Sequence, residues 1–395
     1  MRYKYAIVGG GMTADAAIEG IRQVDPSGSI ALIGSETHPP YNRPPLTKAL
    51  WTGKPLDSIW RRTNRQGVEL RLGRTVAGLD LRQRRVTDDQ GTAYEWDKLL
   101  LATGGTPRRL DGPDQGGRVI YYRALDDYTR LRALTEHGER FAVIGAGFIG
   151  SEITAALAMN NKRAVLLFPS EGIGGRVYPP DLSRFLNEFY REKGVDVQPG
   201  QRIAAVEAAG DKTRVRTQSG LDLLVDGVVA GLGIEPNAGL ARAASLETKD
   251  GVIVDELLRT SHPDVYAAGD VAAFHNPALG RRIRVEHEDN ANTMGRAAGR
   301  NMAGEAGPYH HLPFFYSDLF DLGYEAVGDL DSRLETFADW KQPNREGVVY
   351  YLQQGRVRGV LLWNTWNQVE AARRLIAEPG PFGPADLKSR LPERT

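Results

Sequence analysis

Two short glycine runs carry the most specific chemistry in the sequence. Residues 5–14 read Y-A-I-V-G-G-G-M-T-A, and residues 141–150 read F-A-V-I-G-A-G-F-I-G. Each run follows an apolar stretch typical of a strand and precedes a stretch typical of a helix. At such a turn the backbone approaches a pyrophosphate, and the N–H groups that open the helix bind its phosphates. The sequence therefore predicts two dinucleotide-binding units, and two bound dinucleotides suggest that they exchange electrons.

The positions within each run fit separate geometric tasks. In the first unit Gly9 permits the tight turn, Gly11 lets the backbone approach the pyrophosphate, and Ala14 keeps the helix close to the strand. In the second unit these tasks fall to the matching residues Gly145, Gly147 and Gly150. An ordinary tight turn is the alternative for either run alone, but the same order of strand, turn, helix, strand and acid occurs at both.

An acidic residue about 20 positions further on binds a ribose hydroxyl in such units. The strand at 29–34 leads to Glu36, and the strand at 163–168 leads to Glu171. NADP requires an arginine at this place for its 2′-phosphate, whereas the nearest base in the second unit is Arg176. We therefore predict that the second unit favours NADH over NADPH, with an exposed loop charge as the alternative for Glu171.

Missing residue types exclude other chemistries. The chain has no cysteine, so it cannot pass electrons through a disulfide of its own or use a peroxidatic thiol. His310 and His311 are adjacent and would point to opposite faces of an extended chain. His287 lies among acids without the H-E-x-x-H spacing. We predict no metal site.

Composition is that of a globular enzyme with two or three domains. The 395 residues have a formal net charge of zero, which points to neither nucleic acid nor an anionic membrane as a partner. We expect the basic clusters at 61–62 and 281–284 to be solvated surface, with a docking patch for an acidic partner as the alternative. No stretch of 18 apolar residues predicts a membrane span. The first strand starts at the N-terminus, so we expect no signal peptide and a cytoplasmic location.

The two runs also set the expected domain organisation. We predict a first nucleotide-binding domain from 1–115 and 246–308, interrupted by a second at 116–245, and a C-terminal domain at 309–395. Within the first we expect a hairpin from 69–72 and 85–91. In the C-terminal domain we expect strands at 348–352 and 357–363, a helix at 368–377, and a fraying tail after Glu378. Trp363 and Trp366 are interpreted as core residues there rather than as electron relays.

Several segments carry a family resemblance across nearly the whole chain. They are 40–48, 102–105, 145–152, 266–270, 284–287, 314–319 and 359–364. On these residues the chain resembles the FAD-dependent pyridine-nucleotide oxidoreductases, most of all apoptosis-inducing-factor-like proteins and next the ferredoxin and rubredoxin reductases. The resemblance implies an α/β fold with two Rossmann-like dinucleotide-binding domains, as in glutathione reductase, and a C-terminal α+β domain of the interface or dimerisation type.

The resemblance also implies two cofactors and their sites. FAD would be held by Gly9, Gly11, Ala14, Glu36, Arg43, Lys48, Ala102, Thr103, Gly104, Asp270, Glu286, His287 and Tyr316. NAD(H) would be held by Gly145, Gly147, Phe148, Ile149, Gly150, Glu152, Glu171 and Gly233. The alternative for Asp270 is a helix N-cap, and the alternative for Tyr316 is a core residue. Phe148 would gate the nicotinamide position, with plain helix–sheet packing as its alternative.

Lys48 and Glu152 would be the catalytic pair. The resemblance places them as an ion pair beside flavin N5, with two unrelated surface charges as the alternative. Glu152 follows the second glycine run by two residues, which predicts that it lies at the start of the helix. The helix that begins near residues 286–287 would aim its positive end at flavin N1 and O2.

Two functions follow from the resemblance. The first is an NADH-dependent reductase whose electron acceptor is a ferredoxin, a rubredoxin or a quinone-like molecule. The second is a redox sensor, in which a long-lived complex of reduced FAD and NAD controls dimerisation. A homodimer is therefore one option for the oligomeric state, and no role with nucleic acid is expected.

Overall fold

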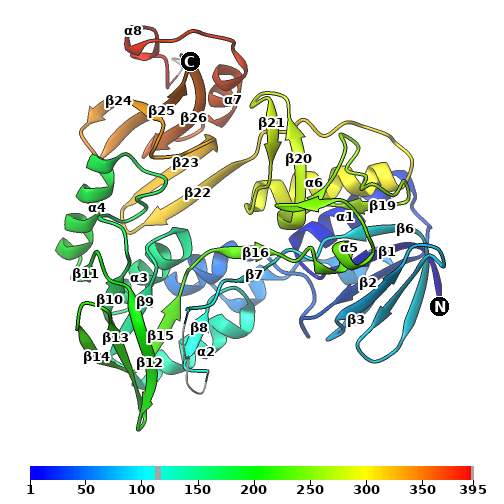
Figure 1. Ribbon diagram of the computed structural model, residues 1–395, viewed down its shortest axis with the longest axis horizontal. Coiled ribbons are helices and arrows are strands. Elements are labelled where there is room, and N and C mark those ends of the chain that lie inside the picture. The colour runs from blue at the N-terminus through cyan, green and yellow to red at the C-terminus, as the bar shows by residue number, and fades with distance from the viewer. Residues whose placement is uncertain (112–116, 393–395) are drawn as a thin grey trace. The chain divides into compact units, whose positions relative to one another are not determined.

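The computed structural model describes residues 1–111 and 117–392, which form two compact units (Figure 1). Unit 1 comprises Met1–Arg43, Leu56–Thr106 and Glu235–Phe314, and unit 2 comprises Pro44–Pro55, Pro107–Ile234 and Phe315–Thr395. The strands at their boundaries, β7 (Gly105–Pro107) and β16 (Ile234–Pro236), pair with each other.

Unit 1 is built on a largely parallel sheet. Its strand order is β3 (Val68–Leu72), β2 (Ile30–Gly34), β1 (Arg2–Val8), β6 (Ala93–Leu101), β5 (Arg85–Asp88) and β4 (Val76–Asp80). A seventh strand, β19 (Val265–Ala267), pairs in parallel with β6, so the chain returns to this sheet after residue 246. β2 is buried along its whole length, as expected of a parallel strand covered on both faces.

The expected hairpin is only partly right. β4 and β5 do form an antiparallel hairpin, but residues 69–72 are not part of it. They belong to β3, which pairs in parallel with β2 at the sheet edge. The polar alternation of this segment reflects an edge position, which a short sequence pattern does not distinguish from a hairpin arm.

Two helices of unit 1 pack against each other through glycine. They are α1 (Met12–Val24) and α6 (Glu288–Met302). A Cβ atom on Gly20 would lie 2.1 Å from the carbonyl oxygen of Arg296, and one on Gly299 would lie 2.0 Å from that of Ala17. The backbones of α1 and α6 therefore lie so close together that there is no room for a side chain at these two positions.

The rest of unit 1 is a small sheet with short helices. The sheet contains β17 (Thr248–Lys249), β18 (Gly251–Ile253), β20 (Ala272–Asn276) and β21 (Arg281–Ile283). The short helices are η3 (Leu56–Ile59), η4 (Thr63–Gln66), α5 (Gly239–Ala243) and η5 (Gly269–Val271).

Unit 2 contains the second nucleotide-binding sheet. Its parallel order is β11 (Asp196–Gln198), β10 (Arg163–Leu167), β9 (Arg140–Ile144), β15 (Gly227–Ala230) and β8 (Val119–Tyr121). An antiparallel sheet covers it with β12 (Ile203–Ala209), β13 (Lys212–Thr217) and β14 (Asp222–Val225), and their apolar side chains share one core. The helices are η1 (Pro44–Leu46), η2 (Ala49–Thr52), α2 (Leu125–His137), α3 (Phe148–Met159) and α4 (Pro180–Glu192).

Unit 2 also contains the C-terminal sheet. Its order is β22 (Phe314–Leu319), β23 (Leu322–Gly328), β26 (Arg356–Trp363), β25 (Glu346–Gln353) and β24 (Glu335–Gln342). The expected strands at 348–352 and 357–363 lie in β25 and β26, and the expected helix is α7 (Val369–Ala377). Aromatic contacts join this sheet to the nucleotide-binding part: the buried Tyr178 packs against the buried Trp363, and the buried Phe189 packs against the partly buried Phe320.

Two expectations about the C-terminal part are wrong. The tail does not fray before residue 392: it forms α8 (Pro384–Leu387), and Leu387 and Leu391 are buried. Proline and glycine here shape a packed turn rather than a loose end. Trp366 is 46% exposed, whereas Trp363 is fully buried as expected.

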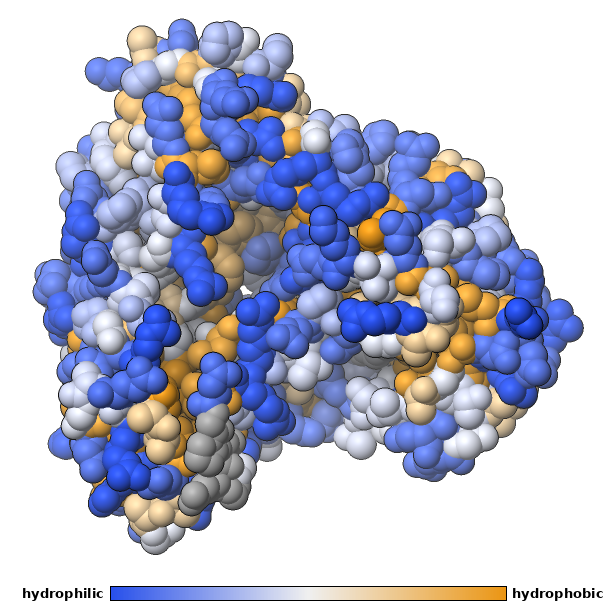
Figure 2. All heavy atoms as spheres, in the orientation of Figure 1, coloured by the Kyte–Doolittle hydropathy of each residue, from blue (hydrophilic) through white to orange (hydrophobic). Residues whose placement is uncertain are grey.

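The surfaces of the units are mixed. On the face that Figure 2 shows, hydrophilic side chains cover most of each unit and hydrophobic ones are scattered between them. Among the described residues, no helix is both long and apolar enough to cross a membrane. Two arginines expected on the surface are largely withdrawn from solvent, because Arg61 pairs with Asp15 and Arg284 pairs with Asp250 and Glu286.

Candidate active site

The first glycine run leaves the N-terminus of α1 open. Gly9 has φ +130° and a Cβ there would lie 2.1 Å from the carbonyl oxygen of Ala102, so this position requires glycine. Gly11 is the N-cap of α1, no side chain caps the helix, and a Cβ on Gly11 would meet nothing within 4 Å. Ala14 is fully buried. This open helix end fits a pyrophosphate.

Glu36 lies just beyond β2, as its predicted ribose role requires. Its carboxylate accepts a hydrogen bond from the Tyr41 hydroxyl at 2.6 Å and forms an ion pair with the Arg43 guanidinium. The structure therefore brings two predicted FAD residues together in one loop, with Tyr41 as a partner that the sequence did not indicate.

Residues 102–104 follow β6 at the carboxyl end of the sheet, the edge at which open α/β sheets bind ligands. Thr103 and Asn237 bind each other reciprocally: Thr103 Oγ1 donates to the Asn237 carbonyl, and Asn237 Nδ2 donates to the Thr103 carbonyl, both at 2.9 Å. Asn237 was not predicted as a site residue, although it ends the glycine-rich strand segment 227–237. Gly104 has φ +63°.

Asp270 and the start of α6 lie on neighbouring loops of unit 1. Asp270 is in η5, and its carbonyl accepts a hydrogen bond from Arg284 at 3.1 Å. The same guanidinium contacts Glu286 at 2.6 Å. His287 is the N-cap residue of α6, so the helix begins where the sequence predicted.

The second glycine run repeats the geometry of the first. Gly145 has φ +96°, and a Cβ on Gly150 would lie 1.7 Å from the Gly145 carbonyl oxygen. Gly147 is the N-cap of α3, with no side-chain cap and nothing within 4 Å of a Cβ. A dinucleotide therefore fits here as well. Two further predicted residues are open to ligand, because Ile149 is 37% exposed and Gly233 has no neighbour within 4 Å of a Cβ.

Glu171 lies on the loop after β10 and is exposed. Asn187 of α4 donates a hydrogen bond to the Glu171 carbonyl at 2.8 Å. This bond fixes the backbone of the loop at Glu171 and does not involve the carboxylate. This placement suits a ribose contact, and it equally suits the alternative of an exposed loop charge.

Glu152 and Lys48 form a largely buried ion pair. Lys48 Nζ lies 2.6 Å from Glu152 Oε2, and their side chains are 15% and 4% exposed. The Thr47 hydroxyl donates to Oε2 and the Ser317 hydroxyl donates to Oε1, each at 2.5 Å. Three donors therefore hold this carboxylate, and the alternative of two unrelated surface charges does not apply.

One detail of the prediction is wrong. Glu152 does not start its helix: α3 begins at Phe148, inside the glycine run, so Glu152 lies in the second turn. The sequence suggests that the helix starts after the last glycine of the run, Gly150. Gly150 is itself helical, because its close contact with Gly145 excludes a side chain but does not exclude helical backbone angles.

One aromatic ring lies against the ion pair, and two more pack on each other from α3 and β22. Lys48 Nζ lies 5.3 Å from the centre of the Tyr316 ring, and Tyr316 is 37% exposed, so it is not a core residue. Phe148 packs edge-on against Phe315 at 5.1 Å. The pKa of Asp318 on the same strand is raised by partial desolvation and by the nearby Glu152, against the opposing effect of Lys48.

Sequence reasoning missed Thr47 and Ser317, which complete the shell around Glu152. Ser317 could have been found from alternation in β22, because it is buried between the exposed residues Tyr316 and Asp318. For Thr47, the only feature of the sequence that indicates a role in the site is its position next to Lys48.

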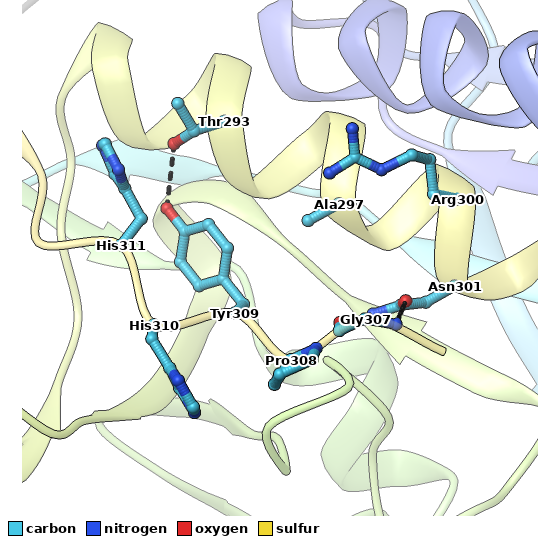
Figure 3. Close-up of a pocket in the computed structure, with 9 residues that line it drawn as sticks. All are labelled: Thr293, Ala297, Arg300, Asn301, Gly307, Pro308, Tyr309, His310 and His311. Atoms are coloured by element: carbon cyan, nitrogen blue, oxygen red, sulfur yellow. Dashed lines mark hydrogen bonds between the residues drawn. The ribbon is translucent and has the colours of Figure 1, made fainter. Parts of the chain in front are cut away.

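A separate cavity of about 270 Å³ lies beside α6 (Figure 3). The side chains of His310 and His311 point in different directions there, as predicted for adjacent residues. Two of its lining side chains already contact acids: Arg300 pairs with Glu305, and His311 Nε2 lies 2.6 Å from an Asp289 carboxylate oxygen. No cluster of metal-ligating side chains occurs in the described parts of the chain.

The helix ends at Gly11 and Gly147 are both of the kind that binds a dinucleotide pyrophosphate, and the chain has no cysteine from which to form a redox disulfide. The pyridine nucleotide-disulphide oxidoreductase family model matches residues 3–295, so the chain belongs to this family. The model of the mitochondrion-associated C-terminal domain of apoptosis-inducing factor matches 298–346 and 338–378. The chain is an FAD-dependent NAD(P)H oxidoreductase of the ferredoxin-reductase-like type.

The relatives include apoptosis-inducing factors and ferredoxin reductases. Mitochondrial apoptosis-inducing factor 1 of Dictyostelium discoideum is 34% identical, over 95% of this chain and 78% of that protein. The ferredoxin reductase subunit of 5,5'-dehydrodivanillate O-demethylase from a Sphingobium species is 35% identical, over 94% and 92%. Putidaredoxin reductase in its covalent complex with putidaredoxin matches with a TM-score of 0.91 and 31% identity, over 99% of this chain and 97% of that one.

Proposed function

We propose that this protein is a reductase that takes electrons from NADH and delivers them, through FAD, to a ferredoxin, rubredoxin or quinone-like acceptor. The observation that carries the proposal is the largely buried ion pair between Lys48 and Glu152 of α3, in a chain without cysteine. Length supports it too, because the chain covers 92% of two ferredoxin reductase relatives.

The proposed division of labour follows the domains predicted from sequence. Residues 1–115 and 246–308 hold FAD, residues 116–245 hold NADH, and residues 309–395 form the C-terminal domain. The open N-terminus at Gly11 takes the FAD pyrophosphate and that at Gly147 takes the NADH pyrophosphate, since both offer N–H groups and the positive end of a helix.

The protein's part in the reaction is to hold a proton and to orient the reactants. FAD, when bound, supplies a hydride acceptor at N5 and can release electrons singly. Glu152 orients the Lys48 ammonium, because Thr47 and Ser317 fix the two carboxylate oxygens of Glu152. Lys48 holds its proton on Nζ toward the flavin, and Phe148 excludes water from the nicotinamide position until the cofactor arrives.

The start of α6 has an electrostatic role in this proposal. Its N-terminal N–H groups and helix dipole stabilise negative charge near flavin N1 and O2. We also propose NADH over NADPH, because Glu171 offers an acid and no base at the ribose position, and a cytoplasmic place of action.

A second function is favoured by two of the comparisons. The C-terminal domain matches that of apoptosis-inducing factor, and the chain is 34% identical to one such protein. In this alternative, slow reduction by NADH gives a long-lived complex that controls dimerisation.

The two functions differ in kinetics. The experiment is anaerobic stopped-flow mixing of the oxidised holoenzyme with NADH, and in parallel with NADPH, followed by a ferredoxin. The reductase proposal predicts fast bleaching with NADH, slower bleaching with NADPH, and rapid reoxidation by the ferredoxin. Slow bleaching with a persistent long-wavelength band that the ferredoxin does not abolish would contradict it and support the sensor.

A further inference from the structure

An acid is buried in the helix that we propose to bind the FAD pyrophosphate. Asp15 lies in the first turn of α1 and is 2% exposed. A carboxylate at the positive end of a helix is favourable by itself. A pyrophosphate bound at the same helix end would be repelled by Asp15, because the pyrophosphate and the carboxylate are both negative and are only partly screened by solvent.

One arginine compensates this charge. Arg61 Nε lies 2.5 Å from Asp15 Oδ2, and the Arg61 side chain is 12% exposed. The other oxygen, Oδ1, accepts a hydrogen bond from the hydroxyl of the fully buried Thr63. Both oxygens of the acid are therefore engaged, and its charge has a cation in direct contact.

The same arginine joins α1 to the loop that carries Glu36 and Arg43. Arg61 Nη1 donates to Asn42 Oδ1 at 3.0 Å, and the Arg61 amide donates to the Pro40 carbonyl at 3.1 Å. The preceding residue, Trp60, forms a β-bridge with Tyr41. The ion pair thus lies where the helix, the loop and the proposed pyrophosphate site meet within unit 1.

We propose that Arg61 is a positioning residue for FAD that neutralises Asp15. Asp15 anchors the loop segment to α1, and Arg61 removes the repulsion that this anchor would otherwise exert on the pyrophosphate. The inference rests on the proposed placement of FAD at Gly11. It predicts the direction of each change in FAD affinity. Loss of Arg61 alone weakens FAD binding, and loss of Asp15 in addition restores it.

The test uses the full chain with its FAD removed, titrated with FAD while flavin fluorescence is followed. The variants are Arg61→Gln, Asp15→Asn and the double variant, with Arg62→Gln as the matched control because Arg62 is exposed. Asparagine is tolerated at 15, since its amide oxygen can face Arg61 while its NH2 faces the Thr63 hydroxyl, which can accept. Thermal unfolding of each apoprotein reports the structural cost separately.

We expect Arg61→Gln to raise the FAD dissociation constant about tenfold or more. We expect Asp15→Asn, the double variant and the control to stay within about threefold of the parent. If both single substitutions weakened FAD binding equally and the double variant showed no recovery, the inference would be overturned. The ion pair would then have only a structural role. Absence of FAD binding in the parent chain would overturn the proposed function as well.

Discussion

At the scale of single residues, the site depends on one buried carboxylate. Glu152 accepts from Lys48, Thr47 and Ser317, so the charge that orients the lysine is itself fixed at both oxygens. A buried charge of this kind is stabilising only while its partners are present. Thr47 and Ser317 therefore contribute both to the stability of the fold and to the position of Lys48.

Replacing Ser317 by alanine tests that dependence. The Glu152 oxygen Oε1 would lose its hydroxyl donor in a buried place, and we expect the free energy of unfolding to fall by about 1–3 kcal/mol. The measurement is thermal or urea unfolding of Ser317→Ala beside Ser27→Ala, an exposed serine. Equal stability of the two variants would show that Ser317 contributes nothing to the shell.

At the scale of elements, the α1–α6 contact depends on glycine where a helix would ordinarily prefer alanine. Gly299→Ala should gain about 1 kcal/mol from helix propensity. Its Cβ would lie 2.0 Å from the Ala17 carbonyl oxygen, however, so we expect net destabilisation of about 2 kcal/mol. Gly239→Ala in α5 is the control, since a Cβ there meets nothing within 4 Å. A stabilised Gly299→Ala variant would refute the close packing.

The end of α1 gives a prediction about pH. The Lys4 ammonium and the Tyr5 hydroxyl, at 2.6 and 2.9 Å, together with backbone N–H groups hold the pKa of Asp25 well below its usual range. A depressed folded pKa stabilises the protein above the unfolded value, and the contribution is lost as pH falls. Asp25→Asn should therefore cost about 1–2 kcal/mol at pH 7, and the difference should shrink below about pH 4. Denaturant unfolding at several pH values measures it, and a pH-independent difference would contradict it.

At the scale of the whole molecule, local patterns predicted the fold better than the site. The glycine runs, β25, β26 and α7 were predictable because each is specified by neighbouring residues. Alternation in β22 could mark Ser317 as buried, but it does not identify Glu152, 165 positions away, as its partner. The pairing of Arg61 with Asp15 was missed for the same reason, since a basic dipeptide ordinarily indicates surface.

Sequence pattern also misjudged parts whose packing is set by distant residues. The tail after residue 378 has the composition of a loose end, yet the Leu391 amide donates to the Tyr350 hydroxyl at 3.1 Å. Residues 69–72 were assigned to a hairpin because edge strands and hairpin arms alternate in the same way. Both errors concern tertiary contacts rather than local preference.

The central claim, that Lys48 serves hydride transfer, is tested most directly by the rate of flavin reduction in Lys48→Met. The measurement is anaerobic stopped-flow reduction by saturating NADH, with Lys54→Met as the matched control because Lys54 is an exposed lysine of the same segment. We predict a rate about 10²-fold lower for Lys48→Met, with FAD binding weakened less than the rate is lowered, and a parental rate for the control. A parental rate in Lys48→Met with full FAD content would contradict the account.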